Sequence, residues 1–359
     1  MRLALLGAFA FPAPLGSQRF AAEQAEALRE AGAEVELLAY GTGDARARGF
    51  DPRKLAADRA LAARLTAAHR ARGFDAVLAH NAEAALVALA LRARLRLPVV
   101  YVAHTLCAEE LASWAPALGA LAPPAGRWLD RALARSADAV LALSGAAERA
   151  IAPAARGPVA LVPPGHTPEA APAPAEIAAA CARRELAPEG FALYAGNLDR
   201  YQDLDVLDAA AARAPGLPLV VATHDTKAAR FRRLRVIEVD SVEEARLLLH
   251  GAAIALLPRR RTGGFPIKLL HYMEAARAIV LRADLAESLV HDESGWLLPA
   301  DAGPDDFAAA LRALAEGAGL RSRLGAGARR ALATRHTWPP LAERTLALVR
   351  AAMARAAGR

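Results

Sequence analysis

The sequence predicts an α/β protein of two domains, each built on a Rossmann-like parallel sheet. Its 359 residues exceed what one hydrophobic core usually organises. Short apolar runs bounded by turn residues alternate with segments of helical period, which is the pattern of βα units around a parallel sheet. A Pro/Ala-rich stretch at 163–174 interrupts the alternation, which then starts again. We therefore expect two such sheets whose strands end at one central cleft.

Six apolar runs of the first half are expected to be strands. They are residues 3–6, 35–39, 76–79, 99–103, 139–143 and 159–162. Helices fill the intervals, and the first, over 18–31, is closed by Gly32. Five strands are expected in the second half. They are residues 191–195, 219–222, 236–238, 253–257 and 279–281. The predicted division is 1–165, 166–337, and a last segment 338–359 whose helix can pack back on the first domain.

Composition narrows the class of protein. Charged residues make up 23% of the chain, and no apolar run reaches the roughly 18 to 20 residues that span a bilayer. The two cysteines, Cys107 and Cys181, lack metal-ligand spacing, and no export signal is evident, so a reducing cytoplasm is expected. The net charge of +7 predicts an acidic partner, either a phosphate donor or an anionic lipid surface such as the inner membrane face. Nucleic acid is not expected, because no basic-aromatic module is present.

Nearly every basic residue is arginine, so the few lysines and side-chain amides are informative. The lysines are Lys54, Lys227 and Lys268, the asparagines Asn81 and Asn197, and the glutamines Gln18, Gln24 and Gln202. If a compositional bias favours Ala, Arg and Leu, a residue that resists the bias is more often required by the chemistry.

The loop after the first strand is a candidate phosphate site. It leads directly into a helix, and Gly16 would let a phosphate approach backbone N–H groups at the helix N-terminus. The same residues also fit an ordinary turn capped by Ser17. No G-x-G-x-x-G fingerprint is present, so a nicotinamide or flavin is disfavoured, and no cofactor is expected.

Polar side chains follow two further strands of the first half. His80-Asn81 and His104 each come directly after a predicted strand, where imidazole can hydrogen-bond sugar hydroxyls or phosphate without a full charge. A structural role for each histidine is the alternative. Glu110 follows in the next segment and can face an acceptor or only solvent.

The second half opens with a polar loop, residues 194–202, that holds a rare asparagine and a rare glutamine. Its candidate donor-binding residues are Asn197, Arg200, Tyr201 and Gln202. Tyr201 could stack on a base or a sugar face, and a well-made turn with Asn at positive φ is the alternative.

The most specific motif spans residues 259–274. Glycines precede a helix that Pro266 helps to start, so Lys268 falls in the first turn and can act on a diphosphate. His271 and Glu274 lie three residues apart on one face. A solvated helix is the alternative. The candidate residues here are Gly263, Gly264, Phe265, Pro266, Ile267, Lys268, His271 and Glu274.

In order and spacing these features resemble the family-4 glycosyltransferases, a retaining group with the GT-B fold. The resemblance covers nearly the whole chain and rests on Gly16, His80, His104, the Tyr-x-Gly at 194, residues 264–273 and residues 287–298. It implies two Rossmann-like domains facing a central cleft and transfer of a sugar from a nucleotide sugar to a glycan, lipid or other acceptor, as in polysaccharide biosynthesis. His104 and Lys268 would be catalytic, the residues around Lys268 and Gly16 would bind the donor, and His80, Asn81 and Glu110 would face the acceptor.

The chain departs from the family at two places. Asn197 and Gln202 stand in a loop that commonly carries Arg and Lys as phosphate ligands. Gly263 and His271 stand where the family carries two glutamates that hold the donor sugar and the ribose. The 196–202 loop is similar to a sub-group of the same family, so a variant site is expected.

By the same resemblance, the reaction would be a front-face displacement in which the departing phosphate accepts the proton of the acceptor. Cationic groups would offset the leaving-group charge, so no metal is required. Two alternatives remain open. A non-catalytic GT-B scaffold would turn over nothing, and a sugar-nucleotide epimerase would turn over its donor without an acceptor.

Overall fold

The computed structural model describes residues 1–12, 16–41, 52–214, 216–224, 231–260 and 263–358. The chain divides into two compact units. Unit 1 comprises Met1–Thr167, Thr262–Phe265 and His336–Arg359, and unit 2 comprises Pro168–Arg261 and Pro266–Arg335. The last helix of the chain therefore groups with unit 1.

Unit 1 is built on six parallel strands. They are β1 (Arg2–Ala10), β2 (Glu34–Tyr40), β3 (Ala76–His80), β4 (Val99–Ala103), β5 (Ala139–Ala142) and β6 (Val159–Leu161). Their order in the sheet is β2-β1-β3-β4-β5-β6. Strands β3, β4 and β5 are buried at every position, as expected where helices cover both faces of a parallel sheet. All six predicted strands are present.

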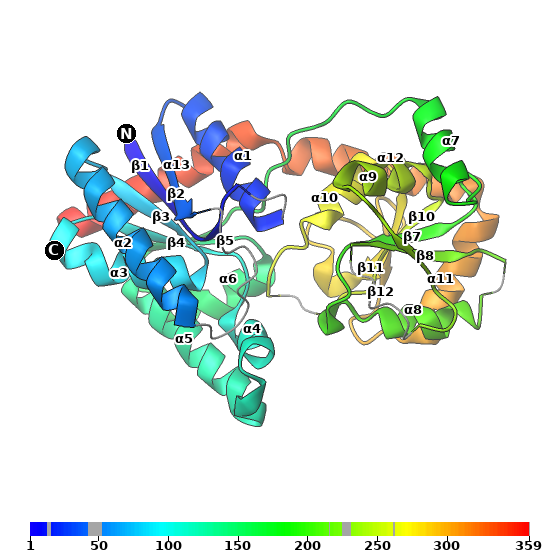
Figure 1. Cartoon of the computed structure of the whole chain (residues 1–359), viewed down its shortest axis with the longest axis horizontal. Coiled ribbons are helices and arrows are strands. Elements are labelled where there is room, and N and C mark those ends of the chain that lie inside the picture. Colours follow the sequence, from blue (N-terminus) through cyan, green and yellow to red (C-terminus); the bar gives the residue numbers. More distant parts are fainter. Residues whose placement is uncertain (13–15, 42–51, 215, 225–230, 261–262, 359) are drawn as a thin grey trace. The chain divides into compact units, whose positions relative to one another are not determined.

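The helices of unit 1 cover both faces of this sheet (Figure 1). They are α1 (Gly16–Glu30), α2 (Pro52–Arg72), α3 (Asn81–Leu95), α4 (Cys107–Trp114), α5 (Ala122–Ser136), α6 (Gly145–Ile151) and α13 (Trp338–Ala357), with short 3₁₀ turns at Pro116–Leu121 and Ala152–Ala154. Helix α1 packs against α13, and α2 packs against α3. The predicted glycine end of α1 is confirmed, because Gly32 has φ +86°.

Unit 2 also contains six parallel strands. They are β7 (Ala192–Ala195), β8 (Leu219–Thr223), β9 (Arg235–Glu238), β10 (Ile254–Leu257), β11 (Ala278–Arg282) and β12 (Trp296–Leu298). Their order is β12-β11-β10-β7-β8-β9. The five predicted strands are present, and the sequence missed β12 because three residues carry no readable period.

Helices α8 and α11 pack together in unit 2, as do α7 with α9 and α10 with α12 (Figure 1). The helices are α7 (Pro174–Arg183), α8 (Leu204–Ala211), α9 (Val242–Gly251), α10 (Lys268–Glu274), α11 (Pro304–Glu316) and α12 (Ala318–Arg335), with 3₁₀ turns at Arg200–Gln202 and Ala283–Leu285. Among the helices of the described residues, none combines the length and the apolar character needed to cross a membrane. The α/β fold with two parallel sheets is confirmed.

Candidate functional site

The edge at which the strands of unit 1 end carries two histidines. His80 is the last residue of β3, and His104 follows the last residue of β4. The strands are parallel neighbours with His80 opposite Val102, so both imidazoles lie at one edge of the sheet. Nδ1 of His80 lies 2.8 Å from Nε2 of His104, a hydrogen-bond distance. The structure therefore brings these two predicted residues together.

Both imidazoles of this pair are neutral near pH 7. Burial, with a smaller contribution from His104, lowers the pKa of His80 well below its usual value. Burial also lowers the pKa of His104 to about 4. The ring of Phe20, on α1, lies 5.7 Å from the His80 ring and 5.4 Å from the His104 ring, centroid to centroid. The pair can thus exchange hydrogen bonds with a ligand but carries no charge.

The neighbouring predicted residues of unit 1 make local contacts. Gly16 is the exposed first residue of α1, and the Ser17 hydroxyl donates to Oε1 of Gln18 at 2.8 Å instead of capping the helix. Asn81 opens α3 at φ 74°, and its side-chain oxygen accepts from the backbone N–H of Ala84 at 3.0 Å. The predicted loop before Gly16 lies partly outside the described residues, at positions 13–15.

Two predicted donor-site glycines, Gly263 and Gly264, lie in unit 1 against the loop after β4. Oε1 of Glu109 accepts from the N–H of Gly263 at 2.9 Å. A Cβ at position 264 would lie 2.5 Å from the carbonyl oxygen of His104. Glycine is needed here for close backbone packing. Glu110, next to Glu109, is half-buried on α4, and the buried Phe265 ring lies 5.3 Å from the His336 ring.

In unit 2 the loop after β7 is held by its own side chains. Oη of Tyr194 donates to the carbonyl oxygen of Asn197 at 2.7 Å. Nε2 of Gln202 donates to Oδ1 of Asn197 at 2.8 Å, and Nδ2 of Asn197 donates to Asp199 at 2.7 Å. The rare asparagine and glutamine are therefore bonded to each other and shape the loop. Arg200 in this loop is exposed.

Lys268 begins α10, preceded by the buried Pro266 and the half-buried Ile267. Its Nζ donates to Oη of Tyr194 at 2.7 Å and lies 4.1 Å from the centroid of that ring. Nζ also lies 3.4 Å from Oε1 of Gln202. In the part of the chain that the structure describes, no carboxylate forms an ion pair with Lys268.

The Lys268 ammonium is closely approached by the backbone at Gly196 and lies near a second cation, Arg259. A Cβ at Gly196 would lie 2.4 Å from Nζ of Lys268, and Gly196 has φ +146°, a conformation that other residues rarely adopt. The guanidinium of Arg259, a largely buried side chain, stands over the Tyr201 ring with its carbon 5.4 Å from the centroid. Burial and the Arg259 charge lower the pKa of Lys268 to about 7, against a smaller opposite effect of Asp199. Such a site suits an anion.

The sequence did not indicate a role for Arg282, a buried arginine that holds the segment after β10 in place. Arg282, fully buried at the end of β11, donates through Nη1 to the carbonyl oxygens of Pro258 and Arg259. Its Nη2 pairs with Oδ2 of Asp203 at 2.7 Å, and Nε of Arg260 pairs with the same oxygen at 2.6 Å. A charged residue at the end of an apolar strand was the available signal.

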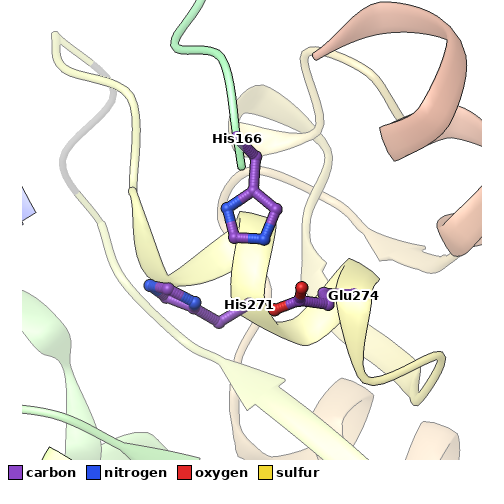
Figure 2. A group of neighbouring side chains, drawn as sticks. All are labelled: His166, His271 and Glu274. Atoms are coloured by element: carbon purple, nitrogen blue, oxygen red, sulfur yellow. The ribbon is translucent and has the colours of Figure 1, made fainter. Parts of the chain in front are cut away.

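The other end of α10 carries His271 and Glu274 (Figure 2). A ring nitrogen of His271 and a carboxylate oxygen of Glu274 lie within 4.8 Å of each other. Oε1 of the buried Glu274 accepts from the backbone N–H of Glu169 at 2.7 Å. One carboxylate oxygen therefore anchors the segment that leads into α7.

Comparison with known proteins identifies glycosyltransferase domains in both halves. The model of Glycosyltransferase Family 4 matches residues 15–170, and that of Glycosyl transferases group 1 matches residues 190–317. No curated protein matches the chain significantly.

Several solved structures share the fold over the full length. Sucrose-phosphate synthase (tll1590) from Thermosynechococcus elongatus is 18% identical, with 98% of each chain covered and a TM-score of 0.78. Alr3699/HepE from Anabaena, solved in complex with UDP-glucose, is 14% identical over 97% of this chain and 99% of its own, with a TM-score of 0.71. Trehalose-6-phosphate synthase OtsA is 13% identical over 98% and 99%, with a TM-score of 0.70. At these identities the likeness shows the fold.

We expect Asp203→Asn to lower the free energy of unfolding by about 3 kcal/mol, because it leaves the buried Arg282 charge without its anion. Asp292→Asn is the matched control. Both aspartates have positive φ, 55° and 62°, which Asn tolerates. Asp292 pairs with Arg323 at the surface, where such a pair contributes under about 1 kcal/mol. Urea unfolding measures both, and equal losses would contradict the supporting role of Asp203.

Proposed function

Because the chain is a glycosyltransferase of the GT-B type, we propose that it takes its sugar from a nucleoside-diphosphate donor whose diphosphate binds at Lys268. The main support is the half-buried ammonium of Lys268, which has hydroxyl and amide partners but, among the described residues, no anionic partner. A diphosphate would supply the missing negative charge and charge-assisted hydrogen bonds. The solved complexes of Alr3699/HepE with UDP and with UDP-glucose support a donor of this class.

The proposed reaction retains the configuration of the sugar. The acceptor oxygen bonds to the anomeric carbon on the face from which the donor phosphate leaves, and the acceptor proton passes to the departing phosphate oxygen. Lys268 and Arg259 offset the charge that develops on the leaving group, so the proposed step needs no metal ion. His104, uncharged, would hydrogen-bond a hydroxyl of the transferred sugar. His271 and Glu274 are the proposed contacts of the nucleoside.

The donor class is tested with a thermal-shift panel of UDP, GDP and ADP, their monophosphates, inorganic diphosphate and the matching glucose nucleotides. We expect a diphosphate to stabilise the chain more than its monophosphate, because the second phosphate would meet Lys268. With the selected nucleotide sugar, slow transfer to water should release the α-anomer of glucose, seen by NMR, at a rate unchanged by chelator. Equal shifts for mono- and diphosphate would contradict the site. Release of the β-anomer would contradict retention, and conversion of the donor into an isomer would favour an epimerase.

We expect the affinity for the selected nucleoside diphosphate to fall as pH rises above about 7. The pKa of Lys268 in the free protein is about 7, and a bound diphosphate would raise it, so binding takes up a proton. Binding is therefore tightest below the free-state pKa and weakens by up to about tenfold per pH unit above it.

Calorimetric titration between about pH 6 and pH 9 measures this slope, and buffers of different ionisation enthalpy report the proton uptake. Lys268→Arg keeps a charge that does not titrate, so its binding should depend less on pH. Lys268→Met should bind weakly throughout. The site assignment is wrong if the wild-type slope equals that of Lys268→Arg.

We further propose that one face of α5 lies on an anionic membrane, where a lipid-linked acceptor would be found. Leu121 and Trp128, seven residues apart and so on one face, are 69% and 70% exposed. Arg131 and Arg135, three and seven residues after Trp128, are exposed on the same face. An aromatic and aliphatic stripe beside arginines is typical of helices that lie in a membrane interface.

Sedimentation with vesicles tests this surface. We expect binding to vesicles containing phosphatidylglycerol and little binding to pure phosphatidylcholine. Arg131→Glu should weaken binding by about thirtyfold, since each basic residue near an anionic surface contributes ~1 kcal/mol and the substitution reverses the charge. Trp128→Ser should also weaken it. Leu86→Ser, which removes a 48% exposed leucine from α3, is the control and should have no effect. Equal binding by all variants would exclude α5 as the contact.

A further inference from the structure

The hydrogen bond between His80 and His104 fixes where the protons of both rings can be. A neutral imidazole has one N–H and one bare nitrogen, so in this pair one ring donates and the other accepts. His80 is 0% exposed, and among the residues that the structure describes its second nitrogen, Nε2, has no hydrogen-bond partner. Both rings are neutral, so neither can donate from both nitrogens.

Two arrangements satisfy the 2.8 Å contact, and they differ in what they leave buried at Nε2 of His80. If His104 donates, His80 carries its proton on Nε2, and a buried N–H stays without an acceptor. If His80 donates from Nδ1, its Nε2 is a bare nitrogen, and an acceptor without a proton stays unused. In folded proteins, orphaned buried N–H groups are rarer than buried acceptors with an unused lone pair. The second arrangement is the more stable one.

The same bond determines the outward-facing nitrogen of His104. With Nε2 accepting from His80, the proton of neutral His104 must be on Nδ1. His104 is only half-buried, and in the described part of the chain its one hydrogen-bonding partner is His80. Nδ1–H is therefore the group that this ring has left for a ligand.

We propose that His80 is a positioning residue, which holds His104 in the Nδ1–H tautomer so that His104 serves its ligand as a neutral hydrogen-bond donor. The tautomer follows from the structure of unit 1 alone, whereas the ligand rests on the proposed function. On that function, the recognised group is an oxygen of the transferred sugar acting as an acceptor.

This assignment limits the chemistry of His104. Its only lone pair is directed at His80, so a neutral His104 has no free nitrogen with which to remove a proton from an acceptor hydroxyl. The pKa of His104 is about 4, and burial holds the pKa of His80 well below its usual value. Above about pH 5 both rings are therefore neutral, and the tautomer assignment applies. His80 is the titratable group that faces His104, and Phe20 on α1 adds only an uncharged ring. His104 then discriminates among sugars by hydrogen bonding and takes no part as a base.

The tautomer is read directly from ¹⁵N–¹H correlation spectra of the full chain labelled with ¹⁵N-histidine. His104→Gln and His80→Asn identify the two rings among the nine histidines. We expect both rings of the wild type to carry the proton on Nδ1, from near neutral pH down to about pH 5. A proton on Nε2 of His104 would overturn the proposal whatever ligand the protein binds.

Two substitutions at His80 test the positioning role. Asn places an amide nitrogen near the former Nδ1 and can still donate, whereas Leu has a similar shape and cannot. We expect His104 to keep the Nδ1–H tautomer in His80→Asn and to populate both tautomers in His80→Leu. The nucleotide sugar selected by the thermal-shift panel should bind His80→Leu about tenfold more weakly than wild type, with recovery in His80→Asn. Its nucleoside diphosphate, which lacks the sugar, should bind all three equally.

A merely structural His80 would give a different result, because damage to the fold weakens nucleoside diphosphate and nucleotide sugar alike. Equal loss of both ligands in His80→Leu, or equal sugar binding by the Asn and Leu variants, would overturn the positioning role. Should the wild type bind no nucleotide sugar at all, the proposed function fails, and the tautomer is still decided by the wild-type spectrum.

Discussion

Parallel pairing of every strand is the constraint on which the candidate site depends. Each sheet has the carboxyl ends of all its strands on one edge, and pairing within the sheet uses the backbone donors and acceptors of the strands. At that edge, free polar groups are supplied by the segments that follow the strands. In unit 1 that edge carries His80 and His104, and in unit 2 the segments after β7 and β10 carry Gly196 and Arg259. Within each unit the sheet topology brings these residues to one edge of the sheet, although they are far apart in the sequence.

The sequence predicted the strands because short, fully apolar runs bounded by turn residues are typical of buried parallel strands, and it predicted Lys268 at the start of α10 because Pro266 marks that helix. It did not predict that Gly263 and Gly264 pack with unit 1, since their close approach to the loop after β4 depends on tertiary contacts. The pairing of Arg282 with Asp203 was equally unreadable, because 79 residues separate the two side chains. Local periodicity identifies elements, whereas side-chain partners distant in the sequence follow only from the assembled sheet.

The 196–202 loop shows how a site can lose expected cations and remain ordered. Charged ligands in such a loop would repel Lys268 and Arg259 in the absence of an anion. Asn197 and Gln202 instead bond to each other, and Asn197 also bonds to Asp199 and, through its carbonyl, to Tyr194. The neutral amides thereby satisfy hydrogen-bonding groups of the loop without adding charge. Beside this loop the buried or half-buried cations are Lys268 and Arg259, whereas Arg200 within the loop is exposed. On the proposed function, Lys268 and Arg259 would therefore carry a larger share of the interaction with the diphosphate.

The choice of lysine at position 268 follows from the same electrostatics. The chain has 45 basic residues and keeps lysine at only three positions, so arginine was the compositionally favoured residue here. An arginine cannot lose its proton, and beside Arg259 it would stand as a second permanent charge in a poorly solvated place. A lysine whose pKa is about 7 is uncharged for part of the time when no anion is bound, which relieves that cost. On the proposed function, it would regain the charge when the donor diphosphate binds. A titratable cation therefore suits this position, and the proposed diphosphate site, better than an arginine would.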